Sequence, residues 1–147
     1  MLIQKGGLVQ NNRVFNQIAS QLMKLYSAEI PVKVDDERQI YAFELKDGVK
    51  INVLSDDGEY IQMVGFIPAP PHIMNAVYLS ELLQFNHFSL HHPFYVIGID
   101  SEQEHKEISL HVRQPMSELD NSAAFDLFEN VIDKSASLQT WLVENVA

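Results

Sequence analysis

The hydrophobic positions near the N-terminus follow the period of an amphipathic α-helix. Asn11 or Asn12 can cap this helix and Pro31 follows its end, so we expect residues 1–11 to be frayed. The positions predicted to face the core are Val14, Ile18, Leu22 and Leu25. The positions at the edge of this stripe, which suit either the core or an exposed groove, are Phe15, Met23 and Tyr26.

A second amphipathic helix is predicted at the other end of the chain, from about residue 121 to residue 144. Its apolar stripe consists of Ala124, Phe125, Phe128, Val131, Ile132, Leu138 and Leu142. Its opposite face is polar, as expected for a helix that packs on a core along one side. Trp141 is interpreted as a packing residue that holds this last helix in place.

Between these helices the apolar positions alternate with a period of two, which is typical of β-strands. Residues 39–46 and 49–53 are joined by Asp47-Gly48, a strong signal for a two-residue hairpin. Asp56-Asp57-Gly58 supplies a second turn, and residues 60–67 form a third strand that is apolar at most positions. The pattern therefore predicts a three-stranded antiparallel meander.

Residues 73–88, which follow the meander, have the widest apolar pattern in the chain. Read as one helix, the segment leaves only Ser80, Glu81, Gln84 and His87 polar. A surface helix needs an apolar arc of roughly 100°, and this arc is much wider. The excess favours a subunit interface over the alternative, a helix buried in its own core. The interface residues predicted on this helix are Tyr78, Leu79, Leu82, Leu83 and Phe85.

A second hairpin is predicted from residues 94–100 and 108–112, with the polar loop 101–106 between them. The element order is then α-β-β-β-α-β-β-α. This order predicts an α+β fold in which helices pack on an antiparallel sheet. The length of 147 residues suits a single domain over residues 1–147, with the central helix joining two copies into a homodimer.

Composition narrows the classes of function. The chain has 10 Lys and Arg against 20 Asp and Glu, a formal charge of -10, so we expect no binding to nucleic acid or to anionic membranes. The acidity suits a partner with basic segments. The absence of cysteine excludes disulfides and thiolate sites and fits a reducing compartment. No apolar run resembles a signal peptide or a membrane span, so we expect a cytoplasmic protein.

No pattern of residues predicts catalysis, a metal site or a cofactor. The 6 histidines, including the adjacent His91-His92, lack a recognisable spacing of metal ligands. The acidic run at residues 56–59 lacks the spacing of a calcium loop and is explained by a turn. No serine lies in a nucleophile elbow, and Glu102 and Glu104 lie in a polar loop that would not raise their pKa values. The pattern favours binding over catalysis.

Four segments together point to a known family. Leu82-Leu83-Gln84-Phe85-Asn86 is a leucine-rich helix ending closed by Asn. Residues 94–100 form a strand that ends Gly-hydrophobic-Asp, and residues 107–111 match its partner strand. Residues 138–142 resemble a terminal helix. In this order the segments resemble the class I type III secretion chaperones, the Tir-chaperone family, over about residues 12–146.

The resemblance implies a homodimer that binds the N-terminal segment of one or more secreted effectors in an extended path. Such a chaperone keeps its effector soluble and competent for export, uses no ATP and stays in the bacterial cytoplasm. Affinity would come from strand addition and apolar grooves. Under this reading the first helix and the meander carry the grooves, so the candidate effector-binding residues are Phe15, Met23, Tyr26, Tyr41, Phe43 and Leu45. The strand containing Phe94 and Val96 would join the central helix in the dimer contact.

Two other hypotheses stay open at this point. The chain could be a chaperone-like binding or regulatory module with no role in secretion, because fold alone does not determine function. It could also be a small enzyme whose site the sequence does not reveal. Paired apolar grooves on a two-fold dimer would favour the secretion chaperone, and a concave pocket with converging polar groups would favour the enzyme.

Overall fold

The computed structural model describes residues 2–86, 95–100 and 107–146. Its helices are α1 (Leu2–Tyr26), α2 (Ala76–Leu83) and α3 (Asn121–Asn145). Its strands are β1 (Val32–Asp35), β2 (Ile40–Glu44), β3 (Lys50–Leu54), β4 (Tyr60–Pro68), β5 (Val96–Asp100) and β6 (Glu107–Pro115). Short 3-10 turns are η1 (Lys46–Gly48), η2 (Pro71–Met74), η3 (Gln84–Asn86) and η4 (Met116–Glu118).

The six strands form one antiparallel sheet in the order β1-β2-β3-β4-β6-β5. The predicted α+β class with helices on an antiparallel sheet is therefore confirmed. The structure adds one strand that the pattern did not predict, β1. Its four residues alternate Val and charged side chains, too short a run to predict a strand by itself. Pairing with β2, with Val32 opposite Phe43, makes it the edge of the sheet.

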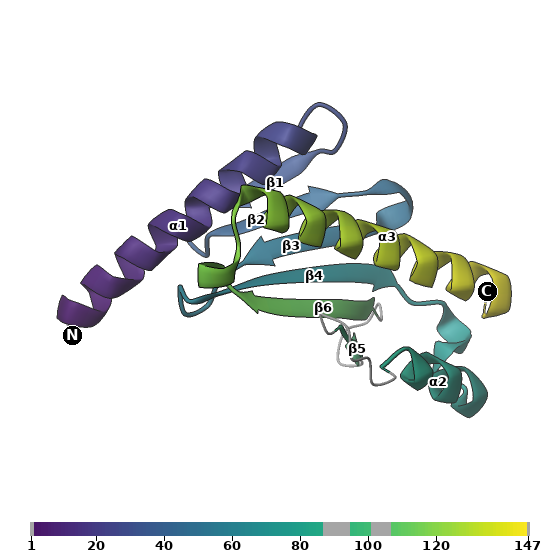
Figure 1. The fold of residues 1–147 in the computed structure, drawn as a ribbon. Helices are drawn as coiled ribbons and strands as arrows, with labels where there is room; N and C mark the ends of the chain where they lie inside the picture. Colours follow the sequence, from purple (N-terminus) through teal and green to yellow (C-terminus); the bar gives the residue numbers. More distant parts are fainter. Residues whose placement is uncertain (1, 87–94, 101–106, 147) are drawn as a thin grey trace.

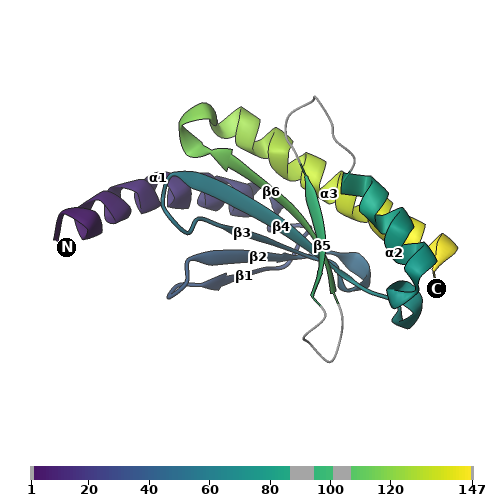
Figure 2. The same cartoon turned by 90° about the horizontal axis from the view of Figure 1, so that it is seen from below.

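Helices α1 and α3 lie side by side on one face of the sheet (Figures 1 and 2). Side chains along β4 alternate between buried and half-buried, so the helix-covered face of the sheet forms the core. The buried core on this face includes Ile18, Leu22, Phe43, Ile51, Ile61, Met63, Phe128 and Val131. Helix α2 lies beyond the end of the sheet (Figure 1), and its Leu82 belongs to a second buried cluster with Leu138 and Leu142 of α3.

The first helix differs from its prediction in extent and in rotation. It begins at Leu2, so Asn11 and Asn12 lie within the helix and do not cap it, and the fraying of residues 1–11 stays a prediction. Val14 is 44% exposed and Leu25 58% exposed, although both were predicted to face the core. Phe15 is buried instead, because its ring packs edge-on against Tyr41 at 5.9 Å. Helix α1 is therefore rotated so that Phe15, and not Val14, faces the sheet.

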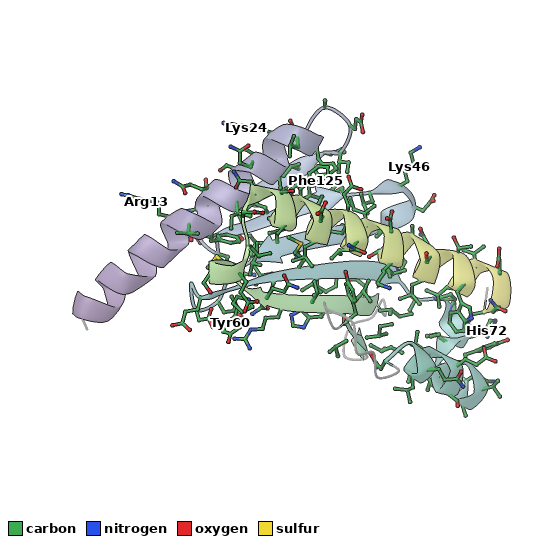
Figure 3. All side chains as sticks on the ribbon, in the orientation of Figure 1. Arg13, Lys24, Lys46, Tyr60, His72 and Phe125 are labelled. Carbon is green, nitrogen blue, oxygen red and sulfur yellow. The ribbon has the colours of Figure 1, made fainter. Side chains whose placement is uncertain are left out.

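Helix α1 is joined to α3 near its C-terminal end. The Tyr26 hydroxyl donates a hydrogen bond to Glu129 Oε1, and the Tyr26 ring stacks on Phe125 with centroids 5.7 Å apart. Figure 3 shows Phe125 on the side of α3 that faces α1. Burial, followed by the Glu129 hydrogen bond, raises the pKa of Tyr26 well above its ordinary value. Tyr26 is therefore part of the contact between the two helices.

The hairpin predicted at Asp47-Gly48 is confirmed. The turn joins β2 to β3, and its two central residues have φ of 61° and 79°, the left-handed values of a type I′ turn. Its main chain is also tied to α3, because Gln139 Nε2 donates to the Asp47 carbonyl at 3.1 Å. Lys46 projects from the same turn (Figure 3).

Helix α3 crosses β4 at a point of very close approach. A Cβ placed on Gly65 would lie only 2.4 Å from Ser135 Oγ. Ser135 is fully buried, and its hydroxyl has no hydrogen-bond partner among the described residues. The absence of a side chain at Gly65 is what lets the helix lie this close to the sheet.

The central helix is shorter than predicted. α2 spans Ala76–Leu83, while the predicted helix ran from residue 73 to residue 88. The turns η2 and η3 flank it, and the Asn75 side chain caps its N-terminus by accepting a hydrogen bond from the Val77 amide at 2.9 Å. Ile73, predicted on the helix, is fully buried in η2. The apolar run is thus divided between a short helix and two turns.

Candidate functional site

A concave surface that is partly apolar lies along α3. It is a groove of about 880 Å3 between α3, the segment that follows α1 and the turn between β2 and β3. We call it the α3 groove. Its apolar lining residues are Ile30, Pro31, Leu45, Val49, Ile132 and Ala136. Its polar lining residues are Glu29, Glu44, Lys46, Asp47, Gln139 and Thr140.

The α3 groove adjoins the free edge of the sheet. Pro31, which lines the groove, directly precedes β1, and β1 is the outermost strand on that side. The main-chain groups of an edge strand that point away from the sheet are available to another extended chain. A strand added beside β1 would therefore pass next to the groove.

The exposed side chains of β1 set what such a strand would meet. Val34 pairs with the buried Tyr41, so it lies on the helix-covered face, where it is 40% exposed. Lys33 and Asp35 lie on the other face, and Lys33 Nζ is 3.2 Å from Glu44 Oε1. An added strand would thus lie beside an apolar side chain of β1 on the helix-covered face and beside charged side chains on the other face.

The residues predicted to bind an effector are spread between the core and the surface. Phe15, Tyr41 and Phe43 are buried in the core, 1%, 9% and 0% exposed. Met23 and Tyr26 are partly buried and pack against that core. Among the six, only Leu45 lines the α3 groove. From the sequence, Pro31 was predicted to follow the helix end, Val49 to lie in a strand and Ile132 to face the core, whereas Ile30 and Ala136 were assigned no role.

The residues predicted to form a dimer contact gather around α2 and β5. Tyr78 and Leu79 are partly buried and Leu82 is buried, while Leu83 is 66% and Val96 59% exposed. The side chain of Phe85 and the whole of Phe94 lie outside the part that the structure describes. We call the exposed apolar side chains of this region, Met74, Val77, Leu83 and Val96, the α2–β5 surface.

A small cavity of about 230 Å3 opens beside this surface. Its lining residues are Leu79, Leu82, Leu83, Asn86, Ile97, Gly98 and Ile99. Helix α2 reaches this position because Leu82 packs in one cluster with Ile97 of β5 and Leu138 and Leu142 of α3. Leu83 is exposed at the rim of this cavity, so apolar side chains are accessible there, as at the core of many interfaces between protein chains.

The described residues offer little for acid–base or metal chemistry. Within residues 2–86, 95–100 and 107–146 no group of three or more His, Asp or Glu side chains could hold a metal ion. His91-His92, Glu102 and Glu104 lie outside those ranges. Burial, together with the positive charge of Arg113, lowers the pKa of His111 below its ordinary value. Asp57 accepts hydrogen bonds from the amides of Glu59 and Tyr60 and pairs with Arg113 at 3.1 Å. This carboxylate of the acidic run at residues 56–59 therefore has a structural role in the turn.

None of the helices in the described ranges combines the length and the hydropathy needed to cross a membrane.

Comparison with solved structures shows how this fold recurs. The type III secretion chaperone SycH of Yersinia pestis, in complex with a fragment of YscM2, has a TM-score of 0.58 at 11% identity, covering 87% of this chain and 98% of that one. A chain of the ExsC–ExsE complex has a TM-score of 0.62 at 12% identity, covering 87% and 95%. YbjN of E. coli, proposed as a transcription regulator, has a TM-score of 0.55 at 14% identity, covering 82% and 86%. At these identities the likeness shows the fold alone.

Sequence comparison is more specific. No curated protein matches the chain by sequence. The sequence model of the Tir chaperone protein (CesT) family, in contrast, matches residues 19–139, which is most of the chain. That range includes β1 to β6, α2 and most of α3. The resemblance found in the sequence is confirmed: the chain belongs to the Tir chaperone protein (CesT) family.

Proposed function

We propose that this protein is a homodimeric type III secretion chaperone. It binds the N-terminal segment of one or more secreted effectors and keeps that segment soluble and competent for export, with no enzymatic step. The observation that carries the proposal is membership of the Tir chaperone family over residues 19–139. The structure supplies two surfaces that suit the task, the α3 groove with the β1 edge and the α2–β5 surface.

The α3 groove and the β1 edge form the proposed effector site. An extended segment can pair its main chain with β1 and place alternate side chains against Val34 and into the groove. Main-chain pairing contributes affinity for any extended segment, whereas the apolar groove selects which side chains fit. The net charge of -10 favours segments with basic residues.

The α2–β5 surface forms the proposed dimer contact. Leu83 and Val96 are 66% and 59% exposed, so their apolar side chains are accessible to another chain. A two-fold dimer would use the same surface on both copies, so an exposed side chain of one copy can enter the small cavity of the other. The surface lies on the opposite side of the sheet order from β1, which leaves the effector site of each copy accessible.

The experiment that tests the function is co-expression with the N-terminal segment of a candidate effector, followed by size-exclusion chromatography with light scattering. We expect a complex of two copies of this chain with one effector segment. The groove itself is tested with Ala136→Arg, which places a long side chain in the groove from an exposed position of α3. Ser137→Arg, at the next exposed position outside the groove lining, is the matched control.

Ala136→Arg should weaken effector binding by about tenfold or more, which corresponds to about 1.4 kcal/mol, while Ser137→Arg should bind as the unmodified chain does. Unchanged binding by Ala136→Arg would remove the α3 groove from the effector site. A dimer that binds no candidate effector would favour the second hypothesis, a binding or regulatory module without a role in secretion. The fold likeness to YbjN, which is proposed to be a transcription regulator, is the reason for naming this alternative.

A further inference from the structure

An open sheet has two edges, and this one ends in β1 on one side and in β5 on the other. An edge strand presents unpaired N–H and C=O groups, which can pair with any extended chain. A protein that accepts an added strand at one edge must therefore block strand addition at the other edge. The described residues show such a difference at Asn86.

Asn86 makes two hydrogen bonds to the main chain of one residue of β5. The Ile97 amide donates to Asn86 Oδ1 at 2.6 Å, and Asn86 Nδ2 donates to the Ile97 carbonyl at 3.0 Å. A carboxamide carries one acceptor and one donor group, the same pair that a strand residue presents. The Asn86 side chain thus takes the place of a neighbouring strand at Ile97.

These two groups of Ile97 point away from the sheet. β5 pairs with β6 in antiparallel register, with Ile97 opposite Leu110. In such a ladder every second residue directs its N–H and C=O towards the partner, and the residues between direct theirs outward. Because Asn86 binds both groups of Ile97, the outward-directed residues within β5 are Ile97 and Ile99. With Ile97 occupied, an incoming strand could form only one main-chain pair inside β5.

The packing of α2 against β5 places Asn86 beside Ile97. Asn86 ends η3, directly after α2, and Leu82 of α2 is buried in the same cluster as Ile97. The cavity beside the two hydrogen bonds is otherwise lined by Leu, Ile and Gly residues. Asn86 itself is exposed but Ile97 is buried, so a main-chain group of Ile97 left without a partner would be costly.

We propose that Asn86 caps the outer edge of β5 and so leaves β1 as the edge at which this sheet accepts an added strand. Two copies that meet on the α2–β5 surface then pack through side chains and do not join their sheets across β5. The statement about the dimer and about what binds at β1 rests on the proposed function. The cap at β5 does not, and it is tested on the chain alone.

The test compares Asn86→Ala and Asn86→Asp with Asn145→Ala. The alanine variant loses both hydrogen bonds to Ile97. The aspartate variant keeps an acceptor for the Ile97 amide and places a charge at the edge, which itself opposes strand addition. Asn145 is the matched control, because its side chain is exposed and donates to the Trp141 carbonyl at 2.9 Å on α3.

Two quantities are measured at several protein concentrations, the hydrogen-exchange rate of the Ile97 amide by NMR and the mass distribution by sedimentation velocity. In Asn86→Ala we expect the Ile97 amide to exchange at least about fivefold faster in dilute solution. We also expect species larger than those of the unmodified chain, increasing with concentration. Asn86→Asp and Asn145→Ala should keep the mass distribution of the unmodified chain.

The cap is refuted if the Ile97 amide of Asn86→Ala stays as protected as in the unmodified chain. It is also refuted if exchange accelerates but the mass distribution does not change at any concentration, or if Asn86→Asp associates as the alanine variant does. Should Asn86→Ala not fold, Asn86→Ser replaces it, because its hydroxyl is too short to reach both groups of Ile97. Effector binding enters none of these measurements, so their outcome is independent of the secretion role.

Discussion

Replacing Gly65 by alanine should destabilise the fold, because α3 leaves no room for a side chain at this point of β4. The added Cβ would lie 2.4 Å from Ser135 Oγ, closer than real Cβ contacts, but 3.5 Å from Ser135 Cβ, an ordinary distance. The conflict is therefore with the hydroxyl alone. Ser135→Ala removes that hydroxyl and should make room for the new methyl group on β4 without moving the helix.

The close approach of α3 to β4 also indicates how large these effects should be. Adding a methyl group to a closely packed interior costs about 1–3 kcal/mol. In a Ser135→Ala background the cost should vanish, and alanine should gain roughly 0.5–1 kcal/mol over glycine within a strand. The two substitutions should thus be coupled by about 1–3 kcal/mol, the steric cost alone, because the preference for alanine over glycine is present in both backgrounds. Ser135→Ala alone should stabilise by about 1 kcal/mol, because it removes a buried hydroxyl without a partner among the described residues.

The assay is urea unfolding of the unmodified chain, both single variants and the double variant, followed by circular dichroism. Thermal unfolding provides a second readout, in which each kcal/mol should move the Tm of a chain of this size by roughly 2–4 °C. Gly98→Ala is the matched control, because its Cβ would meet only Ser109 Oγ, at 3.3 Å and on a half-exposed residue. Free-energy changes that simply add in the double variant would refute the steric argument.

Three further predictions concern the contacts of α1, α2 and β6. Tyr26→Phe should lower the free energy of unfolding, measured by urea unfolding, by about 1 kcal/mol, because it removes the hydrogen bond to Glu129. An unchanged free energy of unfolding would mean that this hydrogen bond does not stabilise the contact between α1 and α3. Leu83→Asp should shift the chain from dimer to monomer in light scattering while the monomer stays folded by circular dichroism, since the side chain is 66% exposed within one chain. Val143→Asp, at 64% exposure on α3, should leave the mass unchanged. A dimer retained by Leu83→Asp would contradict the proposed contact. His111 has a folded pKa below its unfolded value of about 6.5, so its contribution to stability is present above that pH and is lost as the pH falls through the folded pKa. His111→Gln should therefore flatten the pH dependence of Tm between about pH 7 and pH 5. An unchanged slope would mean that another group titrates in this range.

Regular periodicity predicts much of this fold. The 25-residue helix α3 and the strands around Asp47-Gly48 follow from local patterns, because each buries one face in register with its own period. The turn residues add direction, since Asp and Gly adopt positive φ at little cost. The family resemblance rests on the same local segments, which is why it can be recognised from sequence.

Long-range packing decides what those patterns leave open. Residues 14 and 15 are both apolar, and tertiary packing, including the contact between Phe15 and Tyr41, determines which one is buried. β1 is a strand because β2 pairs with it, although its four residues carry no clear signal. The α3 groove combines side chains from three separate segments, so no local pattern could reveal it.

The contrast is clearest around Asn86 and the segment before it. That residues 73–86 are apolar on more than one side and end in an asparagine can be read directly from the chain, because composition and spacing are local properties. Tertiary packing sets how the segment divides into η2, α2 and η3, and it brings the asparagine to Ile97. These hydrogen bonds join residues 11 positions apart, and their geometry depends on how α2 packs beside β5. Hydrogen bonds between distant segments are specified by the whole fold, whereas periodicity is specified by neighbours.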